Sequence, residues 1–316
     1  MHRLTAPLAL CMLASPVLAE TTLRVMSFNI WGAGGNEGKG IEETVAAIKA
    51  ARADIVGFQE TKLEPDPCTA TDCAAVGLSI APALAEALGW FVYDQPSVND
   101  GLWANAVISR YPIVGKATPN EFGVQIDVDG RAIWLFNIHH DDEPYQPYQL
   151  LGIEYGPAPF ITTEADAIRF AAQTRGPMMD LLEQDMKLAD GAAAIFVTGD
   201  FNEPGYLDWT DAAVLAGTQP LKVEWPTSKR LADAGFSDTY RVIYPDPVAK
   251  PAFTWTPRSD EAAKDDHPDR IDFVFAKGAG LKVLDAAIVG EDGPRSDIKA
   301  TPWPSDHRAS VAEVAF

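Results

Sequence analysis

Acidic, amide and histidine side chains occur in this chain where apolar segments end. In the stretch 195–204, an apolar run stops at Gly199 and is followed by Asp200, Phe201 and Asn202. Side chains two residues apart in a strand share a face, so we expect Asp200 and Asn202 to enter one cavity while Phe201 packs inside. An Asx-type turn at the end of a core strand explains this stretch, taken alone, equally well.

The same residue types recur after other apolar segments, which favours an active site over a series of turns. Carboxylates with an amide suit a hard cation with oxygen ligands, so we expect a divalent cation, Mg²⁺ first, with Mn²⁺ or Ca²⁺ as alternatives. Histidines add donors for a phosphate or general acid and base groups. The sequence has no Cys/His cluster for structural zinc and no Walker-type loop. The set comprises Asn29, Glu60, His139, Asp200, Asn202, Asp272, Asp306 and His307.

Strand-like and helix-like segments alternate along the chain, which predicts a single α/β domain. The residues 124–128 and 132–139 flank Asp129-Gly130, the strongest hairpin signal in the sequence. The residues 163–188 have helical spacing, and Gly176-Pro177 is expected to divide that helix. The segment 141–160 has no periodicity and is rich in Tyr and Pro, as functional loops often are.

The first nineteen residues are expected to be a secretory signal peptide, leaving 20–316 as the catalytic domain. A short basic start precedes an apolar run, and small residues precede Glu20. No later segment has an uncharged apolar run long enough to span a bilayer. We therefore expect a secreted or periplasmic protein, and a monomer. In that compartment Cys68 and Cys73 are expected to form a local disulfide.

The formal charge is −20, with 25 basic and 45 acidic residues and no cluster of Lys or Arg. Affinity for a nucleic-acid backbone comes mainly from neutralising phosphates with basic side chains. Tight binding to long nucleic acid is therefore disfavoured, although a local basic groove on an acidic protein would permit it. The charge favours a small-molecule or lipid-headgroup substrate.

Several motifs occur in an order that resembles the endonuclease/exonuclease/phosphatase superfamily, the deoxyribonuclease-like fold. The resemblance covers nearly all of the mature chain. It implies a four-layer sandwich, in which two packed β-sheets are flanked by helices, and a divalent-metal-dependent hydrolysis of a phosphoester. The motifs are Ser27-Phe28-Asn29, Gln59-Glu60, residues 105–112, Asn137-Ile138-His139, residues 199–202, residues 269–273 and Ser305-Asp306-His307.

The resemblance also implies a role for each site residue. It assigns Glu60 as the main metal ligand, with Asn29 and Asp306 also at the metal. It assigns Asp200 to the attacking water, and Asn202 and His139 to phosphoryl oxygens. His307 would contact the phosphate while Asp272 fixes its tautomer.

Three further residues are candidates for contacting the substrate. Asn105 lies in the strand of the family-like motif, and Tyr145 and Tyr148 follow His139 closely enough to overhang the pocket. Aromatic and amide groups there suit an organic leaving group or a sugar-like ring, and nucleobases equally. We expect a phosphatase or phosphodiesterase acting on a small or lipid-derived ester. The alternatives are an extracellular nuclease and a non-catalytic binding protein on the same scaffold.

Overall fold

The computed structural model describes residues 21–63, 77–258 and 261–316. The predicted signal peptide at 1–19 and the predicted disulfide between Cys68 and Cys73 lie outside these residues. Among the described residues, no helix is long and apolar enough to span a membrane.

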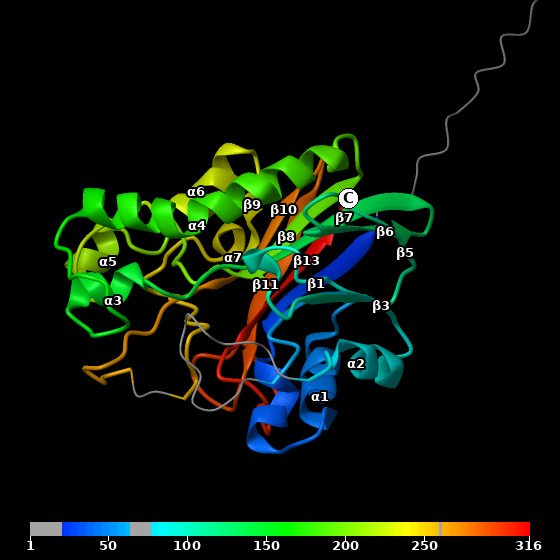
Figure 1. Cartoon of the computed structure of the whole chain (residues 1–316), viewed down its shortest axis with the longest axis horizontal. Helices are drawn as coiled ribbons and strands as arrows, with labels where there is room; N and C mark the ends of the chain where they lie inside the picture. Colours follow the sequence, from blue (N-terminus) through cyan, green and yellow to red (C-terminus); the bar gives the residue numbers. More distant parts are fainter. Residues whose placement is uncertain (1–20, 64–76, 259–260) are drawn as a thin grey trace, which may run out of the picture.

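Two mixed β-sheets pack face to face between layers of helices, as predicted (Figure 1). The seven-stranded sheet contains, in spatial order, β12 (Ile298–Lys299), β11 (Lys282–Gly290), β13 (Ala309–Ala315), β1 (Thr22–Asn29), β2 (Ile55–Gln59), β4 (Ala106–Ser109) and β3 (Phe91–Asp94). The six-stranded sheet contains β5 (Ile113–Lys116), β6 (Gly123–Val128), β7 (Arg131–His139), β8 (Ala194–Asp200), β10 (Asp272–Lys277) and β9 (Ser237–Asp238).

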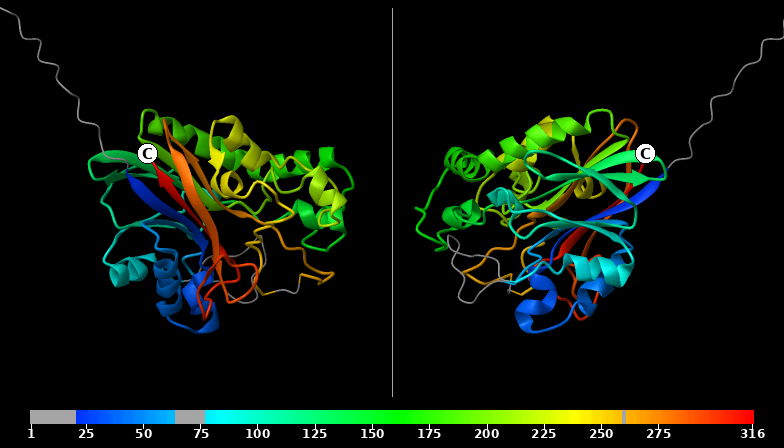
Figure 2. Two further views of the ribbon diagram at one scale, coloured as in Figure 1. Left: turned by 180° about the vertical axis from the view of Figure 1, so that it is seen from behind. Right: turned by 45° about the vertical axis from the view of Figure 1, so that its right-hand side comes forward.

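Helices cover the outer face of each sheet, and Figure 2 shows the same layers from two further sides. The helices α1 (Glu42–Ala51) and α2 (Ala81–Leu88) pack on the seven-stranded sheet. The helices α4 (Glu164–Met186) and α6 (Pro226–Asp233) pack on the six-stranded sheet. The shorter elements are α3 (Gln146–Leu151), α5 (Asp211–Leu215), α7 (Thr239–Ile243), η1 (Trp31–Glu37), η2 (Asp100–Leu102) and η3 (Lys187–Ala189).

The predicted hairpin is confirmed, and the predicted break in the long helix is wrong. Strands β6 and β7 pair through Val128 and Arg131, and Asp129 and Gly130 both have positive φ, as a tight hairpin turn requires. Helix α4 continues through Pro177, whose exposed position leaves the unbonded carbonyl of the preceding turn open to water. Ala171 and Met179, on either side of Pro177, are both buried in apolar clusters beneath the helix, and this packing favours one continuous helix.

The space between the two sheets changes from apolar to polar toward one end. Alternation places Leu23 and Val25 of β1 in the apolar core between the sheets. The next residues on that face are Ser27, whose hydroxyl accepts a hydrogen bond from the Gly199 amide at 2.9 Å, and Asn29. Strands β7 and β8 change in the same way. The polar ends of the strands therefore meet at one edge of the two sheets.

Gly57 allows the two sheets to approach closely just below this edge. A Cβ atom at Gly57 would lie 2.1 Å from the Thr198 hydroxyl and 2.5 Å from the Asn137 side-chain oxygen. The Asn137 amide crosses the gap, donating to the Phe58 carbonyl at 2.8 Å and accepting from the Gln59 amide at 2.6 Å. These bonds fix the relative position of the two strands that end in the candidate site.

Candidate active site

Strand register places three of the predicted residues in one row across the six-stranded sheet. Parallel pairing of β7 and β8 aligns His139 with Asp200, and antiparallel pairing of β8 and β10 aligns Asp272 with Asp200. Asn29 ends β1 in the facing sheet, and Glu60 follows the neighbouring strand β2. Residues far apart in the sequence thus converge where both sheets end.

Asn29 connects the two sheets within the site. Its Nδ2 donates to Glu60 Oε1 at 2.7 Å and to Asp200 Oδ2 at 3.0 Å. Its Oδ1 accepts the backbone N–H of Trp31 at 3.2 Å. The amide nitrogen therefore faces the carboxylates, and the metal-ligand role expected for the Asn29 oxygen would require the amide to rotate by half a turn.

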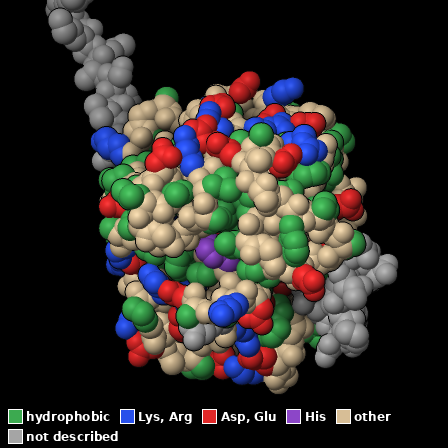
Figure 3. Space-filling model, turned by 90° about the vertical axis from the view of Figure 1, so that its left-hand side faces the viewer, with side chains coloured by type: hydrophobic (Ala, Val, Ile, Leu, Met, Phe, Trp, Pro, Cys, Tyr) green, Lys and Arg blue, Asp and Glu red, His purple; other side chains and the backbone are tan. Residues whose placement is uncertain are grey.

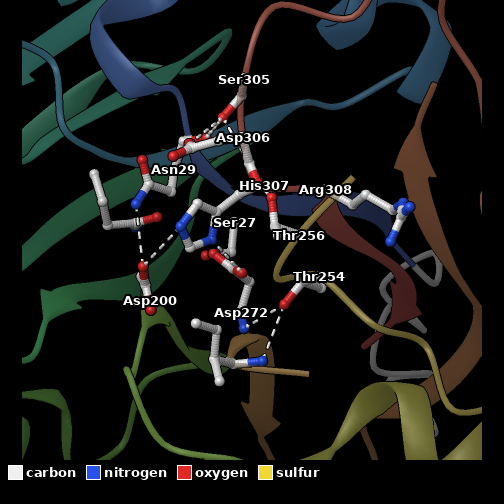
Figure 4. Close-up of polar contacts among 12 residues, drawn as sticks. Ser27, Asn29, Asp200, Thr254, Thr256, Asp272, Ser305, Asp306, His307 and Arg308 are labelled. Atoms are coloured by element: carbon white, nitrogen blue, oxygen red, sulfur yellow. Dashed lines mark hydrogen bonds and ion pairs between the residues drawn. The ribbon is translucent and has the colours of Figure 1, made fainter. Parts of the chain in front are cut away.

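His307 lies between two carboxylates, Asp272 and Asp200 (Figure 4). Its Nδ1 is 3.0 Å from Asp272 Oδ2, and its Nε2 is 3.6 Å from Asp200 Oδ2. Burial alone would lower the pKa of His307, but the charges of Asp272 and Asp200 outweigh it and raise the pKa well above its usual value. The expected pairing of His307 with Asp272 is thus present in the structure.

The segment before β13 holds His307 in place from behind. The Ser305 hydroxyl donates to the Asn29 carbonyl at 2.8 Å and accepts the His307 backbone N–H at 3.0 Å. The Trp255 ring lies 4.8 Å from the imidazole between ring centroids. The side chain of Asp306 points toward Asn29 (Figure 4), and Asp306 is one of the charges that raise the His307 pKa.

Asp200 is the common member of two groups that could hold a metal ion. One comprises Glu60, His139 and Asp200, and the other Asp200, Asp272 and His307, each with its ligand atoms within 4.8 Å of one another. Asp200 and Asp272 are 1% and 0% exposed. Three carboxylates against two imidazoles leave a net negative charge in a buried place, which is costly without a compensating cation. The donor set therefore fits a divalent cation.

Asn202 contacts Asp200 through a turn and not, as predicted, from the same face of a strand. Strand β8 ends at Asp200, and Asn202 has φ +45°, so the two side chains do not share a strand face. Asp200 Oδ1 accepts the backbone N–H of Asn202 at 2.9 Å, and Asn202 Nδ2 donates to the His140 carbonyl at 2.8 Å. The stretch thus forms the Asx-type turn and contributes to the site as well. Phe201 is fully buried, as predicted.

The prediction that Tyr145 and Tyr148 overhang the pocket is wrong. They are 6% and 9% exposed, and pack with Ile271 and Trp255 in a small apolar cluster. The Tyr145 hydroxyl donates to Asp269 Oδ2 at 2.9 Å, and the Tyr148 hydroxyl contacts Asp266. The segment contains helix α3, which sequence periodicity did not indicate because it is only six residues long. Both tyrosines support Trp255 from behind.

Asn105 is also buried. It precedes β4, and its Nδ2 donates to the Gly101 carbonyl at 3.2 Å. Since Ala106 pairs with Phe58, Asn105 lies near the end of β2 and hence near Glu60. Its structural contact is with the loop that carries Trp103.

Sequence reasoning did not identify the residues that orient the site. Thr254 Oγ1 accepts the backbone N–H groups of Ile271 and Asp272, at 3.0 and 3.1 Å, and so fixes the start of β10. Gln59 and Asn137 tie the sheets together below the site. Both belong to motifs already noted. Gln59 ends a buried strand directly before Glu60, and Asn137 precedes His139 by two residues, and these positions were the available signal.

A fold of two packed sheets, with a carboxylate and histidine site at one sheet edge, defines a class of phosphoester hydrolases. The model of the Endonuclease/Exonuclease/phosphatase family matches residues 26–307, and the chain belongs to this family. Membership makes it a hydrolase acting on phosphoesters. An uncharacterized protein of Caenorhabditis elegans, F14F9.5, is 27% identical over 328 residues, which cover 97% of this chain and 95% of that protein.

Solved structures of other proteins share the fold. An endonuclease/exonuclease/phosphatase family protein from Leptotrichia buccalis superposes with a TM-score of 0.52 at 15% identity, covering 93% of this chain and 100% of that chain. An AP endonuclease from Archaeoglobus fulgidus superposes with a TM-score of 0.51 at 17% identity, covering 92% of this chain and 98% of that chain.

Proposed function

We propose that this protein is an exported, divalent-metal-dependent phosphoesterase that hydrolyses a small or lipid-derived phosphomonoester or phosphodiester by attack of water. The observation that carries the proposal is the position of Asp200. Its carboxylate is buried, is oriented by the Asn202 backbone N–H and the Asn29 amide, and lies within 4 Å of two histidines.

The surroundings of Asp200, His307 and His139 suit each of them to a different step of the hydrolysis. Asp200, held from both oxygens, is placed to orient and deprotonate a water molecule. His307 is kept in its charged form by Asp272 and presents Nε2–H toward the space beside Asp200, where a phosphoryl oxygen would sit. His139 Nε2 is 3.7 Å from Asp200 and 3.8 Å from Glu60, too far for strong hydrogen bonds, so it can turn to the substrate.

We assign Glu60 as the main metal ligand, with Asp306 beside it, and Mg²⁺ as the cation. The Glu60 carboxylate offers hard oxygen atoms in a buried place, the donor type that Mg²⁺ prefers. A bound cation would polarise the phosphoryl oxygen and offset the charge that develops in the transition state.

The preference for a small or lipid-derived ester rests on charge. Ion pairs neutralise many of the chain's basic side chains, including Arg258, which pairs with Glu37 near the site at 2.8 Å. An acidic protein without a cluster of Lys or Arg in its sequence is poorly suited to a long polyanion. Export is proposed from the leader-like residues 1–19, and an expected disulfide between Cys68 and Cys73 would suit that compartment.

The decisive experiment is a substrate panel with purified protein in Mg²⁺, Mn²⁺ or Ca²⁺. The panel contains a phosphomonoester, a phosphodiester, sphingomyelin and plasmid DNA. We expect turnover of at least one small ester, abolished by a chelator. Plasmid cleavage at low protein concentration would instead identify a nuclease. Metal binding without turnover of any substrate would identify a binding protein on this scaffold.

A further inference from the structure

Two tryptophan side chains stand partly exposed beside the candidate site, on different sides of it. Trp103 contacts His139, and Trp31 follows Asn29 by two residues. Figure 3 shows histidine atoms in a hollow of one face, with hydrophobic side chains directly beside them. None of the catalytic steps assigned above uses either indole ring.

Trp103 is presented by a firmly anchored loop. Its ring lies edge-on to the His139 imidazole, with centroids 6.1 Å apart and an interplanar angle of 61°. The preceding Leu102 is fully buried, and the Gly101 carbonyl accepts the Asn105 amide at 3.2 Å. A ring held in this way loses little conformational freedom when a ligand packs on it, which favours binding.

Trp31 is held in a conformation that bulky residues rarely adopt. Its φ is +44°, and its backbone N–H is bonded to Asn29 Oδ1 at 3.2 Å. Its carbonyl accepts the Asn36 side chain at 3.2 Å. Left-handed backbone at a non-glycine residue costs free energy and is concentrated at functional sites. The strained backbone at Trp31 therefore favours a functional role for the position of its indole ring.

Arg258 places the Trp31 ring on the Asp306 side of the site. The guanidinium lies 4.4 Å from the ring centroid. The Arg258 backbone N–H contacts the Thr256 hydroxyl at 3.3 Å, and that hydroxyl donates to the Asp306 carbonyl at 2.6 Å. Trp103 therefore borders the His139 side of the site and Trp31 the Asp306 side.

We propose that Trp31 and Trp103 are specificity-determining residues that select a small phosphodiester bearing a flat aromatic group of the nucleobase type. The inference rests on the proposed phosphoesterase function and narrows its substrate. Every nucleobase has a flat face that can stack on an aromatic side chain, so such stacking does not depend on which base is present. Arg258, the basic side chain that lies on the Trp31 ring, is paired with Glu37 and is therefore not free to bind a polymer backbone. Recognition then comes from the ring and the single phosphate rather than from a chain of phosphates.

Two esters with the same leaving group test the proposal. Thymidine p-nitrophenyl phosphate carries a base on the retained side, and methyl p-nitrophenyl phosphate does not. We expect wild-type kcat/KM to favour the thymidine ester by roughly fivefold to a hundredfold, the range that stacking of one base on an aromatic side chain provides. The double variant W31A/W103A is expected to lose most of that preference, and W103A and W31A alone to show which ring contributes more.

Phe91→Ala is the matched control. Phe91 is 48% exposed on edge strand β3, at the end of the strand that pairs with Ser109, away from the site. This variant should keep the wild-type preference. Equal kcat/KM for the two esters in wild type, or an unchanged preference in W31A/W103A, would overturn the inference.

Binding measurements separate this inference from the proposed function. If no ester of the substrate panel is hydrolysed with any of the three metals, the proposed function fails, and calorimetry still decides the inference. Thymidine 5′-phosphate should bind more tightly than methyl phosphate to wild type, and less tightly to W103L, which keeps apolar volume but lacks a flat ring. Should W31A/W103A fail to fold, W103L also replaces it in the kinetic assay. Equal binding of the two phosphates to wild type contradicts the proposal.

Discussion

Asp200 receives hydrogen bonds on both carboxylate oxygens, from the Asn202 backbone N–H and from Asn29 Nδ2. Asp200→Asn keeps the shape of the side chain but removes its ability to take a proton. We expect kcat to fall by roughly a hundredfold to ten-thousandfold, the usual contribution of a general base. The measurement is kcat on the best small ester, together with the thermal unfolding midpoint.

The unfolding midpoint of Asp200→Asn should remain within a few degrees of wild type, because the loss is chemical. Asp285→Asn, an exposed carboxylate on β11, is the control and should leave kcat unchanged. Near-normal turnover by Asp200→Asn would mean that Asp200 does not act on the water.

Glu60 is assigned to the metal, so its replacement should change metal dependence before it changes chemistry. In Glu60→Gln we expect the Mg²⁺ concentration for half-maximal activity to rise by roughly tenfold or more, because a neutral amide is a weaker ligand for a hard cation. Activity titrated against Mg²⁺ measures this directly. Glu86→Gln, at an exposed position of α2, is the matched control. An unchanged Mg²⁺ titration in Glu60→Gln would refute the assignment.

At the level of single residues, the sequence indicates which side chains converge at the sheet edge better than it indicates how they are oriented. Residues at strand ends can be recognised from the apolar run before them, as for Asn29 and Asp200. Which way the Asn29 amide faces depends on Glu60 and Trp31, which are brought to it by other parts of the chain. Tyr145 was misplaced because only the fold shows that its hydroxyl has a buried partner.

At the level of elements, α4 shows packing overriding a local signal. Pro177 lacks the N–H needed inside a helix, yet the helix runs from Glu164 to Met186. We expect Pro177→Ala to stabilise the protein by about 1–3 kcal/mol, since proline is about 3 kcal/mol less favourable than alanine in a helix interior. Denaturant unfolding measures the change. Ala172→Gly, exposed in the same helix, should destabilise by about 1 kcal/mol. A destabilised Pro177→Ala would show that the proline relieves strain there.

Asp269, three residues before β10, is expected to make stability depend on pH. Burial raises the pKa of Asp269 to about 8, although hydrogen bonds from Trp209 and Tyr145 oppose the shift. The folded state thus keeps a proton that the unfolded chain loses near its ordinary value of 3.8. This contribution to stability is complete below pH 4 and is lost as the pH rises toward 8, by up to about 1.4 kcal/mol per pH unit.

Asp269→Asn tests this sign, because an amide resembles the protonated acid and cannot titrate. The free energy of unfolding should fall between pH 5 and pH 8 more steeply in wild type than in the variant. Denaturant melts of both proteins at four pH values give the difference. Parallel curves for the two proteins would mean that Asp269 is ionised in the folded state.

At the scale of the whole molecule, the two-sheet architecture was predictable, and the pairing that builds the site was not. Alternation in β1 and β8 is visible in the sequence and predicts which residues share a face. That Asp272 lies beside Asp200 depends on antiparallel pairing between strands 72 residues apart in the chain, which only the ordered family motifs indicated. Likewise, the sequence around Gly57 does not indicate that the two sheets approach each other closely there. The glycine is required by the Thr198 side chain, which comes from the other sheet.

The charge of the whole molecule leads to a prediction about salt. A protein of charge −20 repels an anionic ester at long range, and dissolved ions screen that repulsion. The screening length falls from roughly 30 Å at 0.01 M salt to roughly 8 Å at 0.15 M. We expect kcat/KM for thymidine p-nitrophenyl phosphate to rise several-fold over this range at constant free Mg²⁺. A nuclease with a basic groove shows the opposite trend, because salt weakens its phosphate contacts. A fall of kcat/KM with added salt would therefore indicate a local positive field at the site. That result would favour a nuclease over an enzyme acting on small esters.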